Sequence, residues 1–78
     1  MKVKVVGKEH RTGISKKSGN PYDCTVAHIE YTRNRVEGKA TEMVWLDTAS
    51  FDPNSVIVGK EYNLDRDGAG YIVGFDMV

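Results

Sequence analysis

Residues 22–32 read Tyr-Asp-Cys-Thr-Val-Ala-His-Ile-Glu-Tyr-Thr, and this stretch predicts a β-strand. Side chains alternate between the two faces of a strand, so the stretch divides into two sets. One face would carry Tyr22, Cys24, Val26, His28 and Glu30, and the other Asp23, Thr25, Ala27, Ile29 and Tyr31. Such alternation, with β-branched and aromatic residues, is typical of strands.

Four further strands are expected around this one, at residues 2–6, 41–46, 56–64 and 71–77. Turn-forming residues separate the strands, and a short helical turn is expected at residues 48–51. Trp45 and Phe51 are assigned to the core. The pattern predicts an all-β fold, a small closed or partly open antiparallel barrel of five strands that forms one domain over residues 1–78.

Charge is distributed unevenly along a chain whose formal net charge is zero. Residues 1–39 carry nine bases and four acids, whereas residues 40–78 carry two bases and seven acids. One interpretation is a local positive surface for an anionic partner. The other is chance sorting of charges over a solvated surface, and composition leaves both open.

The sequence offers no constellation typical of an enzyme or a metal site. His10 and His28 have no acid or cysteine at ligand spacing, and Cys24, the single cysteine, lies in an apolar stretch that favours a buried thiol. Residues 63–68 match only the first half of a calcium loop, because Gly74 stands where the bidentate glutamate belongs. We therefore expect no catalytic activity, no cofactor and no metal.

The hydropathy of the chain bears on its location. No run of about 18 apolar residues occurs, which predicts that the chain does not cross a membrane. Residues 1–6 lack the long apolar stretch of a signal peptide. A cytoplasmic protein is the expectation.

The segment at residues 11–22 is the most informative for function. It combines small residues with three cations and one aromatic residue: Arg11, Lys16, Lys17 and Tyr22. A cationic loop can follow a phosphate backbone while a tyrosine at its base stacks on an unpaired nucleobase, as in binders of single-stranded nucleic acid. The alternative is a solvated hairpin in which Tyr22 packs at the end of a strand.

Further candidates lie outside this segment. The loop at residues 32–39 adds three cations that could contact phosphates or a second subunit, or form an ordinary charged loop: Arg33, Arg35 and Lys39. Arg66 is another candidate, although its acidic neighbours weaken its attraction for phosphate. Tyr31 fits either base stacking or core packing.

Residues 13–22, Gly-Ile-Ser-Lys-Lys-Ser-Gly-Asn-Pro-Tyr, resemble a segment of the filamentous-bacteriophage single-stranded-DNA-binding (helix-destabilising) protein family. The family segment has the form Gly-x-Ser, basic residues and then Gly-x-Pro-Tyr, and the likeness extends in outline over nearly the whole chain. The resemblance implies an OB-type barrel with protruding hairpins that acts as a homodimer. It also implies cooperative, sequence-independent coating of single-stranded DNA during phage or phage-like replication in the host bacterial cytoplasm.

The resemblance also assigns roles to individual residues. Arg11 looks like the family's phosphate-binding arginine, and Lys16 or Lys17 stands where the family has a loop arginine. Tyr22 looks like its base-stacking tyrosine, and Cys24 occupies the place of an apolar residue of the binding strand. The loop at 32–39 corresponds to the one that the family uses near its dimer axis.

The chain departs from the family at its C-terminal hairpin, and two other functions also fit the sequence. The family tends to carry an aromatic residue at the tip of its C-terminal hairpin, whereas residues 65–70 form an acidic tip here. A small β-barrel adaptor that binds protein would leave the basic hairpin merely solvated. An RNA-binding OB or cold-shock-like domain would carry aromatic residues on adjacent strands of one face, and the sequence alone does not show such a cluster.

Overall fold

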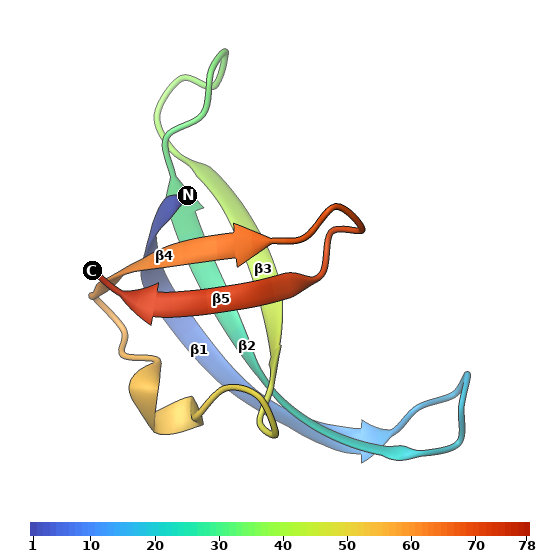
Figure 1. The fold of residues 1–78 in the computed structure, drawn as a ribbon. Helices are drawn as coiled ribbons and strands as arrows, with labels where there is room; N and C mark the ends of the chain where they lie inside the picture. The colour runs from blue at the N-terminus through green and yellow to red at the C-terminus, as the bar shows by residue number, and fades with distance from the viewer.

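A computed structural model describes all 78 residues, and its five strands form one antiparallel sheet (Figure 1). The elements are β1 (Lys2–Ile14), β2 (Pro21–Tyr31), β3 (Ala40–Asp47), the 3₁₀ helix η1 (Pro53–Ser55), β4 (Glu61–Arg66) and β5 (Ile72–Met77). The expected all-β class, with five antiparallel strands, is confirmed.

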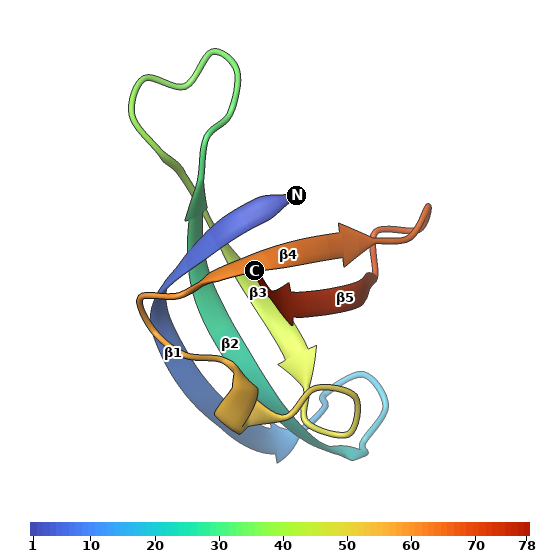
Figure 2. The same cartoon turned by 60° about the vertical axis from the view of Figure 1, so that its left-hand side comes forward.

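The sheet is strongly curled, and the β4–β5 hairpin lies across one face of β1, β2 and β3 (Figures 1 and 2). The strand order is β3-β2-β1-β4-β5, so β3 and β5 form the two edges. These edges do not pair with each other, and the sheet therefore remains open where a closed barrel would join them.

The core lies between the β4–β5 hairpin and the inner face of the other three strands. It contains ten buried residues: Val3, Val5, Ala27, Ile29, Val44, Leu46, Val56, Tyr62, Leu64 and Phe75. The rings of Tyr62 and Phe75 stack with their centroids 4.7 Å apart, an arrangement that adds to the burial of apolar area. Burial of this apolar surface is the main force that holds the hairpin against the sheet.

Strand β1 is much longer than the expected strand at residues 2–6. A bulge interrupts its pairing with β2, because Val5 lies opposite Ile29 and Gly7 lies opposite His28, which leaves Val6 as the extra residue. Beyond the bulge β1 carries polar residues on both faces, since this part of the hairpin extends past the core. The apolar alternation that reveals a strand is therefore missing there.

The other boundaries differ less. Residues 56–60 form a loop, and β4 begins only at Glu61, although Val56 is buried in the core. Residues 48–51 form the expected turn, in which the Phe51 N–H donates to the Asp47 carbonyl at 2.8 Å. The 3₁₀ helix η1 follows this turn, and the Asp52 side chain caps it by accepting a hydrogen bond from the backbone N–H of Asn54 at 2.9 Å. Proline at the first helical position suits this start.

Trp45 does not lie in the core, where the sequence analysis placed it. Its neighbours Val44 and Leu46 point to the core and are fully buried, so alternation turns the indole to the opposite face of β3, where 49% of Trp45 is exposed. Phe51, in contrast, packs against the core as expected.

The Tyr62 hydroxyl anchors the loop before β4, and we predict that Tyr62→Phe destabilises the fold. This hydroxyl donates to the Ser55 carbonyl at 2.6 Å and accepts from the Ile57 N–H at 2.7 Å. Its loss leaves partly buried backbone groups unpaired, which costs about 1–3 kcal/mol of unfolding free energy in urea titrations. Tyr71→Phe, at a highly exposed tyrosine, is the control and should change stability by less than about 0.5 kcal/mol. Equal effects of the two substitutions would contradict this assignment.

Candidate nucleic-acid interface

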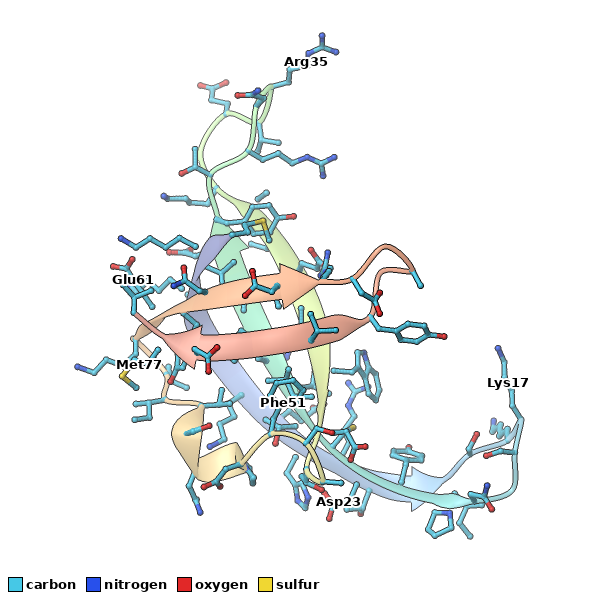
Figure 3. The ribbon with its side chains drawn as sticks, in the orientation of Figure 1. Lys17, Asp23, Arg35, Phe51, Glu61 and Met77 are labelled. Carbon is cyan, nitrogen blue, oxygen red and sulfur yellow. The ribbon has the colours of Figure 1, made fainter.

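The β1–β2 hairpin carries the cationic segment away from the core. Its tip is closed by two backbone hydrogen bonds, from the Ser15 N–H to the Asn20 carbonyl at 2.9 Å and from the Gly19 N–H to the Ser15 carbonyl at 2.8 Å. Gly19 has a φ of 72°, a conformation that glycine adopts without strain. Lys16 and Lys17 are exposed at this tip, and Figure 3 shows Lys17 far from the rest of the molecule.

The register of the sheet brings three of the predicted residues to one face. Gly13 pairs with Tyr22, and Arg11 pairs with Cys24, which in turn pairs with Asp47. Directly paired residues of antiparallel strands point to the same face. Arg11, Tyr22 and Cys24 therefore share the outer face, opposite to the face that packs against β4 and β5.

Tyr22 is positioned by the glycine across from it. A Cβ atom at Gly13 would lie 2.9 Å from the Tyr22 hydroxyl oxygen and 3.1 Å from the ring carbon that bears it, so a larger residue at this position would displace the ring. The phenol therefore lies across the β1 backbone while 41% of Tyr22 stays exposed to solvent. This arrangement presents an aromatic surface at the base of the cationic hairpin.

Trp45 provides a second aromatic ring on the same face. The Arg11 guanidinium carbon lies 4.9 Å from the centroid of the indole, within cation–π range, and the Arg11 Nε also pairs with the Glu9 carboxylate. Sequence reasoning missed Trp45 because it assigned the indole to the core. The signal that could have found it is the alternation of Trp45 with Val44 and Leu46 along β3.

Tyr22 and Trp45 line one open groove of about 470 Å³, together with Ser15, Cys24 and Asp47. Only 7% of Cys24 is exposed, and burial raises the pKa of its thiol. Arg11 acts in the opposite direction, while Asp23, Asp47 and Glu9 raise the pKa further. The thiol therefore stays neutral at pH 7 and forms an apolar part of the groove.

The remaining predicted residues lie elsewhere. The β2–β3 loop holds Arg33, Arg35 and Lys39 at the end of the molecule opposite to Lys17 (Figure 3). Arg35 has a φ of 67°, and the Lys39 ammonium donates to the Thr32 hydroxyl at 3.1 Å.

Tyr31 and Arg66 meet at the inner side of the sheet, away from the groove. The Tyr31 hydroxyl donates to the Glu42 carboxylate at 3.3 Å, and Arg66 forms an ion pair with the same carboxylate. Arg66 is the last residue of β4, so it precedes the hairpin tip where the sequence placed it. Together with Arg33, these residues line a separate hollow near the N-terminus of the chain.

Several cations of the sheet are engaged in ion pairs or hydrogen bonds, whereas most cations of the β1–β2 and β2–β3 loops are not. Lys2 pairs with Glu61 at 2.9 Å, Arg66 pairs with Glu42, and the Lys8 ammonium donates to the carbonyls of Pro53 and Val56. No ion pair forms at four exposed loop cations: Lys16, Lys17, Arg33 and Arg35. Both loops therefore carry cations without an ion pair, as do Lys4 of β1 and Lys60 before β4.

Comparisons with protein-family models, with curated proteins and with solved structures give no match. Nowhere do three or more histidine, cysteine, aspartate or glutamate side chains gather in a way that could hold a metal ion. None of the helical structure has the length and apolar character needed to cross a membrane.

We predict that Cys24 reacts slowly with iodoacetamide. Only the thiolate attacks, and a raised pKa lowers the thiolate fraction at any given pH, so at pH 8 the folded protein should react more slowly than the same protein in urea. The pH–rate profile of the folded protein should also rise at a higher pH. Coincident profiles for folded and unfolded protein would show that the thiol is not desolvated.

Proposed function

We propose that this protein binds single-stranded DNA without catalysing a reaction and with little dependence on sequence. The observation that supports the proposal is the outer-face groove, in which the half-exposed rings of Tyr22 and Trp45 lie beside Arg11 at the base of a hairpin with two free lysines. Aromatic surfaces next to a cationic path are what unpaired bases and their phosphates require.

In the proposed mechanism, phosphates follow the hairpin and bases enter the groove. Lys16 and Lys17 neutralise phosphates and release counterions, which makes the affinity fall as salt rises. Arg11 exchanges its pairing with Glu9 for a phosphate. Every base has a π-face, so stacking on Tyr22 and Trp45 accepts all of them.

Helix destabilisation follows from this mechanism without any energy source. A protein that occupies single strands preferentially shifts the equilibrium between duplex and separated strands by mass action. A role in phage or phage-like replication, in the host bacterial cytoplasm, rests on the resemblance of residues 13–22 to the phage family.

Cooperative binding as a homodimer also rests on that resemblance. It is supported by the unpaired edge strand β5, where Val73 and Met77 are exposed. An exposed, apolar strand edge is a surface on which a second sheet can pair. Sedimentation of the free protein tests this arrangement.

Loss of either ring of the groove should weaken binding. Stacking contributes about 1–3 kcal/mol per base, so Tyr22→Ala and Trp45→Ala should each reduce the affinity for oligo-dT by roughly 5- to 150-fold. The measurement is fluorescence anisotropy of a labelled oligonucleotide at low salt. Tyr71→Ala, which removes an exposed tyrosine outside the groove, is the control and should bind as the parent does.

Two outcomes of this titration would redirect the assignment. If no oligonucleotide binds at low salt, the single-strand function is wrong, and the open strand edges favour the protein-binding adaptor. If oligo-U of equal length binds more tightly than oligo-dT, the RNA-binding alternative replaces DNA.

The hairpin lysines should determine the salt dependence. Each phosphate contact contributes about 0.7 to the slope of log affinity against log salt for single strands, so replacing Lys16 and Lys17 by glutamine should reduce the slope by about 1.4. The double change Arg33→Gln and Arg35→Gln, at the opposite end of the molecule, should alter it little for an oligonucleotide of about eight nucleotides. If the arginine changes reduce the slope more than the lysine changes do, the phosphate path lies at the β2–β3 loop instead.

A further inference from the structure

One polar group of the groove has no role in the mechanism above. Asp47 ends β3, faces outward beside Cys24 in the register and lines the groove with Tyr22 and Trp45. Its Oδ1 accepts a hydrogen bond from the Ala49 N–H at 3.1 Å, which leaves Oδ2 without a partner in the protein. Asp47 is exposed and forms no ion pair, so its carboxylate is free to accept a hydrogen bond from a ligand in the groove.

This carboxylate determines which part of a nucleic acid the groove can hold. A phosphate would be repelled by Asp47, whereas a base enters between the aromatic side chains without that penalty. An ionised carboxylate is an acceptor only. The base edge that meets Asp47 must therefore supply a hydrogen-bond donor.

We propose that Asp47 makes the groove selective for nucleobases with an exocyclic amine over thymine. The amine of cytosine, N4, is a donor of the kind that aspartate accepts from, whereas thymine carries the acceptor O4 at the same position. The donor that thymine does have, N3–H, lies between the carbonyl oxygens O2 and O4, which repel an approaching carboxylate. Adenine and guanine also carry an amine. The inference rests on the proposed single-strand function and adds a modest base preference to stacking that by itself accepts any base.

The sharpest test compares cytosine with thymine, because both are pyrimidines and offer rings of similar size for stacking. Labelled oligo-dC and oligo-dT of about eight nucleotides are titrated by anisotropy at pH 7.5 and low salt. The parent protein should bind oligo-dC roughly five-fold more tightly, as one partly exposed hydrogen bond to a charged group allows.

Asp47→Asn removes the charge and keeps the shape. The asparagine oxygen can still accept from the Ala49 N–H, so the turn after β3 is retained, but the side chain now offers a donor as well as an acceptor. The ratio of the two affinities should fall to about one. Asp76→Asn, at an exposed carboxylate of β5, removes the same charge away from the groove and should leave the five-fold ratio intact.

The outcomes separate the two proposals. Equal affinities of the parent for oligo-dC and oligo-dT, with tight binding of both, would overturn the role of Asp47 and leave the single-strand function standing. A preference for oligo-dC that survives in Asp47→Asn would overturn it as well. Absence of binding to either oligonucleotide would remove the single-strand function and this inference with it.

Discussion

The antiparallel pairing of β1 with β2 is the constraint on which the rest of the structure depends, and the bulge at Val6 is its critical detail. Before the bulge, Val3 and Val5 point into the core. A one-residue shift exchanges the two faces of a strand. If Val6 instead paired regularly with His28, Arg11 would lie opposite Asp23, in step with Val3 and Val5, and would point to the inner face. The bulge thus lets one strand supply the core with valines and the outer face with an arginine.

The part of the hairpin beyond the core is held by different interactions. There β1 and β2 have no second layer to pack against, and cross-strand contacts replace it: the Tyr22 ring lies over Gly13, and His10 pairs with Asp23 at 2.6 Å. Arg11 reaches across β2 to the face of Trp45. His10 and Asp23 lie on the inner side of the hairpin, whereas the contacts of Tyr22 and Arg11 organise the outer face and leave both aromatic rings half exposed. Tyr22 and Trp45 therefore stabilise the hairpin and also line the open groove.

The sequence was sufficient for the fold class but not for the site. Alternation in residues 22–32 identifies β2, and the sorting of its side chains into two faces holds in the structure. The second half of β1 could not be recognised, because a strand outside the core needs no apolar face. Trp45 was misplaced because both of its neighbours are also apolar, and only the burial of Val44 and Leu46 reveals which face is inward. The groove forms only when β1, β2 and β3 pair in their observed register, and no single segment of the sequence specifies that pairing.

The uneven charge along the chain has a spatial counterpart that composition alone does not give. In the sheet, β1 and β2 of the basic half lie between β3 and β4 of the acidic half, and the ion pair Lys2–Glu61 joins the two halves. The ion pair Arg66–Glu42 forms within the acidic half. These pairs engage Lys2 and Arg66, whereas Lys16 and Lys17 in the β1–β2 loop form no ion pair. The cationic β1–β2 loop therefore lies beside a groove that contains the carboxylate of Asp47. An anionic polymer on this surface would therefore have its backbone drawn to the hairpin and its bases turned into the groove.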